Sequence, residues 1–227
     1  MVPTPKDKLK DIVNQGVKID IFDAEEAIKL YEVIGNYKEK LVKDNFDNLF
    51  GVFQIALIKN TILAINKIYE EPKNKYQLRS LPDAVKILKD NCNDLKIEYR
   101  EQLEEKLTNW GFDKKCLISL SDSELTNIVA EALSTKLPSQ DEIKDIKDVR
   151  DKRVAHHEFI DETKISSIMW PHLEDLLERA KKIVGVIGNH YLGSFYENND
   201  GEYVFSSEVS KTSRSLVRLF QKAGIVN

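Results

Sequence analysis

Residues 46–69 form the segment that most constrains the fold, because their apolar side chains would lie almost all round a helix. A helix that is apolar on every side is typical of the middle of a helical bundle. Lys59 and Asn60 interrupt the run, which leaves it too polar and too short for a convincing membrane span. We therefore expect a buried core helix whose few polar side chains are hydrogen-bonded.

A second apolar stripe runs from Val85 to Trp110 in steps of three and four residues. This periodicity is a strong helix signal. It predicts one long helix over 81–110, roughly 45 Å in length at the rise of an α-helix. Gly111 would end this helix.

Three pairs with capping-box spacing mark further helix starts, since a small polar residue and an acidic residue three positions later satisfy each other's backbone donors. The pairs are Asp23 with Glu26, Ser121 with Glu124, and Ser139 with Glu142. They predict helices over 24–43 and 121–134, and a third helix from 139. Apolar periodicity predicts two more helices, over 165–195 and 207–222.

Composition agrees with an all-α fold, since only 9 glycines and 6 prolines occur in 227 residues. We expect an up-and-down helical bundle over 23–195, with an insertion at about 112–137. Residues 1–22 are read as a loose N-terminal lead-in. Residues 196–227 are read as a C-terminal arm with one helix.

The charge balance limits the function classes. The formal net charge is −4, whereas a broad nucleic-acid footprint makes a domain basic, so any RNA contact must be a local patch. Cys92 and Cys116 have neither metal-ligand nor disulfide-framework spacing, which favours a reducing compartment. The first residues lack the apolar core of a signal peptide. We expect a cytoplasmic protein without a membrane partner.

The segment 150–158, RDKRVAHHE, contains the candidate catalytic residues. It holds Arg150 and two of the four histidines of the chain, His156 and His157. A guanidinium can hold a phosphate through two parallel hydrogen bonds, and an imidazole can transfer a proton near neutral pH. Such a pair could cleave a phosphodiester without a metal. The alternative is an exposed, charged helix end.

On a helical wheel Arg150 falls on the apolar side marked by Ile143, Ile146 and Val154. A charge at such a position needs a partner. Arg150 therefore either forms an internal ion pair or faces a polar cleft or a subunit seam. His156 lies about 120° from Arg150 on the same wheel.

Other sites find little support. His156, His157 and Glu158 could ligate zinc, but adjacent residues on a helix point apart. Glycine-rich phosphate loops, nucleophile elbows and kinase motifs do not occur, so no cofactor or metal is expected. His172 and His190 are interpreted as hydrogen-bonded residues at the core boundary.

RDKRVAHHE resembles the signature of the HEPN superfamily, in which an arginine is followed after four to six residues by a histidine. The form Arg-Asp-Lys, two residues, Ala-His resembles the abortive-infection, AbiU-type branch. The upstream segment 46–88 also resembles that branch, with an apolar second helix, a Tyr-containing turn and a Ser-Leu helix start. The likeness covers about residues 40–190.

The resemblance implies an α-helical homodimer whose motif helices face each other and form a composite, metal-independent ribonuclease site. Arg150 matches the arginine and His156 the histidine. Asp151 matches the polar residue that often follows the arginine. Lys152, one turn before His156, could add positive potential. His157 is the alternative to His156 as the catalytic histidine, because it lies nearer Arg150 on the helical wheel.

Two functions remain open. The first is a metal-independent endoribonuclease of HEPN type, in phage defence or a toxin–antitoxin system, with RNA as substrate. The second is a non-catalytic HEPN-like binding or dimerisation module in which Arg150 forms a structural ion pair. An antitoxin protein is a further expected partner, and the arm over 193–227 could serve as the segment that binds it.

Overall fold

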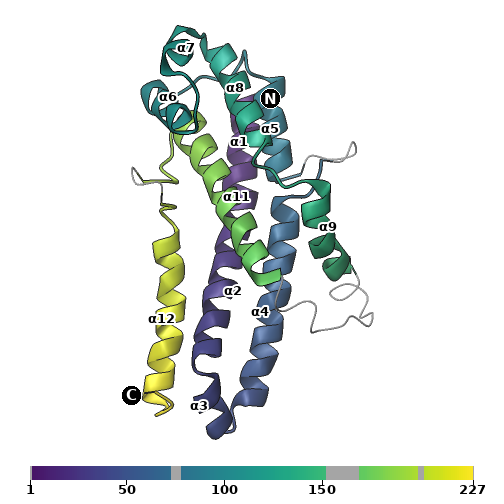
Figure 1. The fold of residues 1–227 in the computed structure, drawn as a ribbon, viewed down its shortest axis with the longest axis vertical. Helices are drawn as coiled ribbons and strands as arrows, with labels where there is room; N and C mark the ends of the chain where they lie inside the picture. The colour runs from purple at the N-terminus through teal and green to yellow at the C-terminus, as the bar shows by residue number, and fades with distance from the viewer. Residues whose placement is uncertain (1, 73–77, 152–168, 199–201, 227) are drawn as a thin grey trace. The chain divides into compact units, whose positions relative to one another are not determined.

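The computed structural model describes residues 2–72, 78–151, 169–198 and 202–226 (Figure 1). These ranges are helical and contain no strand, only an isolated bridge between Glu197 and Tyr203, which confirms the all-α prediction. The helices are α1 Pro5–Ile12, the π-helix η1 Val13–Val17, α2 Lys18–Asn36, α3 Lys38–Lys43, α4 Asp47–Ile68, α5 Leu81–Asp90, α6 Arg100–Asn109, α7 Lys114–Ser119, α8 Asp122–Ser134, α9 Gln140–Val149, α11 Met169–Tyr191 and α12 Ser206–Lys222.

The chain forms two compact units. Unit 1 comprises Met1–Ile19, Lys67–Glu142 and Glu178–Val204, and unit 2 comprises Asp20–Asn66, Ile143–Leu177 and Phe205–Asn227. Helices α2, α4, α9 and α11 contribute residues to both units. The predicted division into bundle, insertion and arm stays a prediction.

The N-terminal segment is helical where a loose lead-in was expected. Thr4 and Asp7 form a capping box that opens α1, and Pro5 stands at the first turn, where its missing N–H costs no hydrogen bond. The apolar side chains of α1 and η1 are fully buried. A Cβ on Gly16 would overlap the side chain of Arg79, so this glycine permits a close approach and does not break the helix.

The predicted long helix over 81–110 is wrong, because the structure divides it into α5 and α6. The helix α5 ends where Asn91 donates both its backbone N–H and its side-chain amide to the carbonyl of Ile87. Between the two helices Leu95 and Ile97 are buried while their neighbours are exposed. The spacing of apolar residues that predicted one helix therefore continues across a turn, which Asn and Asp residues form.

The predicted helix over 24–43 is also corrected. The helix α2 begins at Lys18, so that Asp23 lies inside it and does not cap it. Tyr37 separates α2 from α3. Asp23 and Glu26 have the spacing of a capping pair but lie inside a continuous helix. The buried residues Ile21, Ala24 and Ile28 form one apolar face on both sides of Asp23.

The other two capping pairs are confirmed. Ser121 and Glu124 form the capping box of α8. The backbone N–H of Ser139 donates to Glu142 Oε2 at 2.7 Å, and that of Glu142 donates to Ser139 Oγ at 3.2 Å. The expected C-terminal helix is confirmed as α12.

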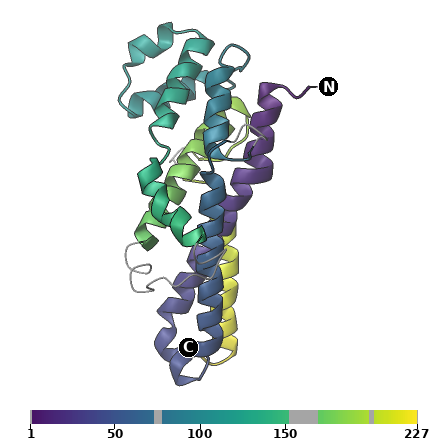
Figure 2. The same cartoon turned by 90° about the vertical axis from the view of Figure 1, so that its right-hand side faces the viewer.

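Unit 2 has a core to which α12 contributes. Phe220 is fully buried, and its ring contacts those of Tyr37 and Phe50 with centroid distances of 5.6 and 5.1 Å. Ile34 and Leu41 belong to the same cluster. Figures 1 and 2 show α2, α4 and α12 side by side.

The helix α4 is buried on one face only, which corrects the expectation that it is surrounded by protein. Phe50 and Leu57 pack on the core of unit 2, and Ile65 is fully buried. Leu49 and Phe53 are about half exposed, although the ring of Phe53 lies 5.8 Å from that of Phe50. Among the described residues, α4 is the helix whose length and apolar composition would allow it to cross a membrane, which is weak support for a span.

Candidate functional site

The start of α9, the helix that leads into the motif, is held by reciprocal bonds. Glu142 accepts hydrogen bonds from Ser139, which lower the pKa of its carboxyl group. The same carboxylate accepts a hydrogen bond of 3.0 Å from Arg179 in α11. Residues 139–142 are therefore anchored within unit 1 by charge-assisted contacts.

The inner face of α9 is built from Ile143, Ile146 and Val149, which are all buried. Val149 is the last α-helical residue, and Arg150 and Asp151 after it are π-helical. The side chain of Arg150 is 33% exposed. The structure therefore places the guanidinium partly in solvent, although the wheel extended the apolar side through Arg150.

Arg150 is paired with its neighbour in the chain. Both its Nε and one terminal nitrogen lie 2.7 Å from Oδ1 of Asp151. The carboxylate is 56% exposed. An ion pair in such contact with water is weak, so a phosphate group could replace the carboxylate at small cost.

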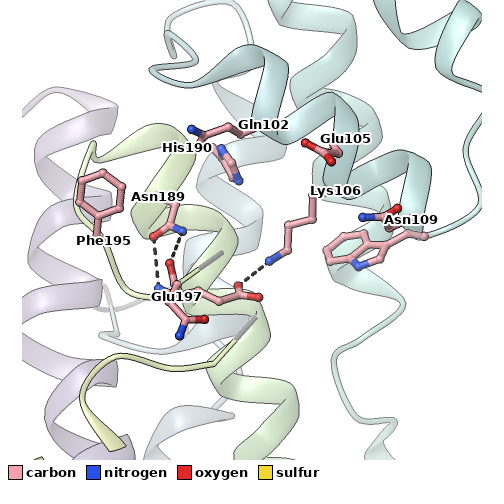
Figure 3. Close-up of a pocket in the computed structure, with 10 residues that line it drawn as sticks. Gln102, Glu105, Lys106, Asn109, Asn189, His190, Phe195 and Glu197 are labelled. Carbon is pink, nitrogen blue, oxygen red and sulfur yellow. Dashed lines mark hydrogen bonds and ion pairs between the residues drawn. The ribbon is translucent and has the colours of Figure 1, made fainter. Parts of the chain in front are cut away.

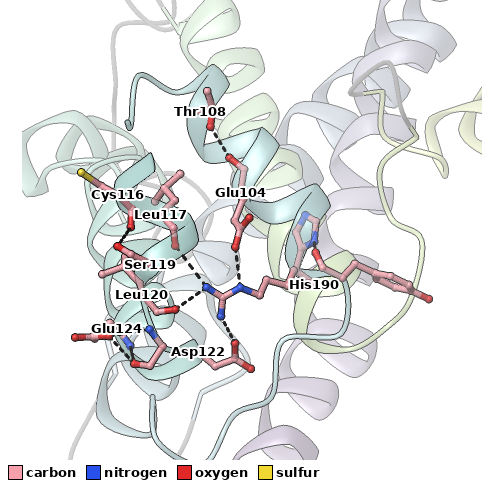
Figure 4. Close-up of polar contacts among 12 residues, drawn as sticks. Glu104, Thr108, Cys116, Leu117, Ser119, Leu120, Asp122, Glu124 and His190 are labelled. Atoms are coloured by element: carbon pink, nitrogen blue, oxygen red, sulfur yellow. Dashed lines mark hydrogen bonds and ion pairs between the residues drawn. The ribbon is translucent and has the colours of Figure 1, made fainter. Parts of the chain in front are cut away.

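Arg100 shows what a structural arginine looks like in this chain. Its Nε donates to Glu104 at 2.7 Å and one terminal nitrogen donates to Asp122 at 2.5 Å. The other terminal nitrogen lies 2.6 Å from the carbonyl oxygen of Leu120 and 3.4 Å from that of Leu117 (Figure 4). This guanidinium joins α6 to the end of α7 and is committed to that role, in contrast to Arg150.

The remaining predicted site residues lie outside the described residues. They are Lys152, His156 and His157, together with Glu158. The structure therefore describes the arginine of the motif and Asp151, and the roles assigned to the histidines stay predictions. His172 is half-buried and His190 is buried, as their interpretation as core-boundary residues requires.

A polar cleft of about 630 Å³ lies in unit 1, away from the predicted motif in the sequence (Figure 3). Its walls come from α6, from the end of α11 and from the loop that follows α11. Sequence reasoning did not find it, because 102–110 and 189–198 meet only in the folded chain. No local motif marked either segment.

The loop wall of the cleft is fixed to α11. Asn189 accepts a hydrogen bond of 2.7 Å from the backbone N–H of Tyr196 and donates one of 3.0 Å to the carbonyl of Glu197. A Cβ on Gly185 would overlap Glu197, and a Cβ on Gly188 would overlap Tyr196. The two glycines, one helical turn apart, therefore let the loop lie directly on the helix.

The charges of the cleft argue against a phosphate ligand. Lys106 Nζ lies 2.5 Å from Glu197 Oε2, so this ammonium group is already neutralised. Glu105 adds a further carboxylate to the lining. Burial lowers the pKa of His190 to about 4, so its imidazole is neutral at physiological pH. The carbonyl of Tyr99 lies 3.2 Å from His190 Nδ1, which assigns the proton to that nitrogen.

Metal-type clusters of three or more His, Cys, Asp or Glu side chains are absent from the part of the chain that the structure describes. Cys92 is half-buried in the turn after α5 and accepts a hydrogen bond of 3.4 Å from Ser123. Cys116 is exposed. Neither thiol stands in a cluster that would make it a ligand.

Comparison with known proteins links most of the chain to one family. The HEPN family model described as AbiU2 matches residues 6–211. No curated protein and no solved structure shows a significant match. The matched range includes the motif segment, the cleft and the start of α12.

Proposed function

This chain belongs to the AbiU2 family of HEPN domains, and from that premise we propose that it is a metal-independent endoribonuclease that acts in phage defence. The observation that carries the proposal is the state of Arg150. Arg150 directly follows α9; its guanidinium is one third exposed and is paired with a carboxylate that is itself in solvent. Such a cation can exchange its partner for a phosphodiester.

The chemistry follows from the residue types. His156 removes the proton from the 2′-hydroxyl of RNA, and the 2′-oxygen attacks the adjacent phosphorus. The bond from phosphorus to the 5′-oxygen breaks, and a protonated imidazole returns a proton to that leaving oxygen. Arg150 stabilises the charge that develops on the phosphoryl oxygens. His157 is the alternative base.

The setting of this activity is part of the proposal. Two copies of the chain supply the site, with Arg150 and His156 meeting across a seam between motif helices. Lys152 raises the local positive potential, which an acidic chain needs in order to hold RNA at all. The protein works in the cytoplasm, and an antitoxin protein restrains it until infection.

The test is RNA cleavage by the purified protein in the presence of EDTA. We expect Arg150→Ala to reduce cleavage by about a thousandfold, in the range known for the loss of one charge-stabilising donor. His156→Ala and His157→Ala identify the base. Arg79→Ala is the matched control, because Arg79 forms an exposed ion pair with Asp11. Cleavage that persists in the Arg150 variant, or that requires a divalent metal, contradicts the proposal.

The second candidate is a non-catalytic HEPN module. The pairing of Arg150 with Asp151 and the net charge of −4 favour it, because both reduce the attraction of RNA. In that case the wild-type protein cleaves no RNA under any condition tested. RNA binding at low salt, measured by fluorescence anisotropy, then separates an RNA-binding module from a protein-binding one.

A further inference from the structure

The outward face of α12 carries a line of basic side chains. The basic residues of this helix fall within an arc of about 80° on a helical wheel at about 100° per residue. They are Lys211, Arg214, Arg218 and Lys222, and all of them are exposed. Successive members lie three or four residues apart, which is about 4.5–6 Å along the helix axis. We call these residues the basic stripe.

The opposite side of α12 is packed and turns the basic stripe toward solvent. Val209 and Phe220 are buried, and on the wheel both lie across the helix from the stripe. Phe220 belongs to the core cluster of unit 2. At the start of α12, Lys29 donates hydrogen bonds of 3.2 Å to the carbonyl of Ser206 and to Ser210 Oγ. The rotation of α12 about its own axis is therefore set by contacts within unit 2.

The arginines of the basic stripe differ from the other arginines that the structure describes. Those that form an ion pair with a carboxylate are Arg79, Arg100, Arg150 and Arg179. In the stripe, Lys211 pairs with Glu208 at 3.0 Å. Within the described residues, Arg214, Arg218 and Lys222 have no carboxylate in ion-pair contact. The donors of these two guanidinium groups are therefore available to a ligand without the displacement of a protein carboxylate.

We propose that the basic stripe binds the phosphate backbone of the RNA that the protein cleaves, an inference that rests on the proposed function for the identity of the strand. The helix α12 contains four basic residues and one acidic residue, whereas the whole chain has a net charge of −4. The stripe is therefore the kind of local positive patch that an acidic chain needs in order to attract a polyanion.

The family assignment does not account for this surface. The match to the family model ends at residue 211, so that Arg214, Arg218 and Lys222 lie beyond it. The stripe also differs from the proposed catalytic site, because Arg150 directly follows α9 and the stripe belongs to α12. We therefore assign the stripe to holding the strand and not to the chemical step.

The side chains of α12 suit phosphates and not bases. A guanidinium holds a phosphate through two parallel hydrogen bonds. The stripe extends over about 16 Å from Lys211 to Lys222, which gives a strand a row of cations to follow. Among the residues of α12, all of which the structure describes, no aromatic side chain is exposed for a base to stack on. We therefore expect binding that does not depend on the RNA sequence.

An anionic membrane fits this surface less well than RNA. A helix that lies in a membrane interface buries an apolar face among the lipids. In α12 that face is already used, because Val209 and Phe220 are buried in unit 2. Leu219 is 56% exposed beside the stripe, but one leucine offers too little apolar surface for insertion.

The first experiment measures the binding of a 2′-O-methyl oligouridine, which has no free 2′-hydroxyl to react, by fluorescence anisotropy with the full chain. The variant replaces Arg214 and Arg218 by glutamine. We expect its affinity to be about tenfold lower at about 50 mM salt. The slope of log K against log salt should fall by about 1.4, since each lost phosphate contact on a single strand removes about 0.7.

Two controls separate the stripe from net charge. Lys114→Gln with Lys115→Gln removes two exposed cations from α7 and should bind like the wild type. Arg214→Lys with Arg218→Lys keeps the charge and should keep the salt slope. Circular dichroism checks that each variant keeps its helices. Unchanged binding by the glutamine variant of the stripe, or an equal loss in the α7 control, overturns the proposal.

Other polyanions test the identity of the ligand. Polyglutamate should displace the oligouridine only weakly when compared at equal charge, because its carboxylates are not held in the row that a phosphate backbone provides. Vesicles of phosphatidylcholine and phosphatidylglycerol should not bind the protein at the same salt concentration. Displacement by polyglutamate as effective as by RNA indicates an acidic protein as the occupant and contradicts the proposal. Vesicle binding that depends on Arg214 and Arg218 contradicts it as well.

Cleavage kinetics distinguish this inference from the proposed function. The glutamine variant of the stripe should raise KM about tenfold with little change in kcat, whereas Arg150→Ala lowers kcat. RNA binding that depends on the stripe in a protein that cleaves no RNA would overturn the ribonuclease and leave the stripe as an RNA-binding surface. Cleavage that depends on Arg150, with wild-type binding and KM in the stripe variant, would overturn the stripe and leave the ribonuclease.

Discussion

Arg150 shares a single carboxylate oxygen of Asp151 between two of its nitrogens, each at 2.7 Å. The two residues are adjacent in the chain and both are partly in solvent. This is an ion pair that forms without tertiary structure and is worth little to the folded state, in the range of about 0–1 kcal/mol for exposed pairs. Its weakness is what makes Arg150 available to a ligand.

Replacing Asp151 should increase RNA binding. In Asp151→Asn the guanidinium loses its resident anion, and the negative charge that repels RNA is removed as well. We expect an affinity for single-stranded RNA about threefold higher at low salt, with Asp151→Glu close to the wild type. Fluorescence anisotropy measures both. Equal or weaker binding by the asparagine variant would show that Asp151 does not compete with RNA.

Arg100 should matter for stability and not for activity. Its loss leaves two carboxylates and two carbonyl oxygens without their donor. We expect Arg100→Met to lower the free energy of unfolding by about 1–3 kcal/mol, since the group is mostly but not fully buried. Urea titration followed by circular dichroism gives the value. Arg79→Met, which breaks an exposed pair with Asp11, is the comparison and should change little.

Stability should fall in mild acid because of His190. Burial lowers the pKa of this buried imidazole to about 4, whereas the unfolded value is 6.5. The unfolded chain therefore binds more protons between these two values, and stability is complete above pH 6.5 and is lost as the pH falls toward 4. The shift corresponds to about 3 kcal/mol. Urea titrations from pH 7.5 to 4.5 measure it.

The control for this pH dependence is a change of histidine. His190→Gln removes the titrating group and should flatten the slope, whereas His172→Gln should keep it, because His172 is only half-buried. A slope that survives in His190→Gln would assign the effect to other groups.

Two glycine-to-alanine changes should act in opposite directions. A Cβ at Gly188 meets the ring of Tyr196, which is buried and whose hydroxyl donates to Asn14. We expect Gly188→Ala to cost about 1–3 kcal/mol of unfolding free energy. A Cβ at Gly35 in α2 meets nothing within 4 Å, so Gly35→Ala should stabilise by about 0.5–1 kcal/mol. Thermal unfolding compares them, and equal effects would contradict the assigned contacts.

Local signals predicted the helices that begin with a real cap. Ser121 with Glu124 and Ser139 with Glu142 open helices as expected, because the capping interaction needs only four consecutive residues. Asp23 with Glu26 has the same spacing and caps nothing. The difference comes from residues 18–22, which are already helical and include the fully buried Ile21.

Apolar periodicity was less reliable at turns. The stripe from Val85 to Trp110 kept its spacing across residues 91–99, although these do not form a helix. Buried positions in an extended segment, such as Leu95 and Ile97, can coincide with helical spacing over a short distance. The asparagines at the end of α5 were the better signal.

The sequence by itself determined the all-α class and the HEPN family, because each depends on residues that are close together in the chain. The tertiary structure alone decided three things: that Arg100 and not Arg150 is the committed arginine, that a polar cleft forms between 102–110 and 189–198, and that Leu49 and Phe53 of α4 are about half exposed. Each of these depends on which distant segments pack together, and an apolar residue carries no mark of the neighbour that will bury it.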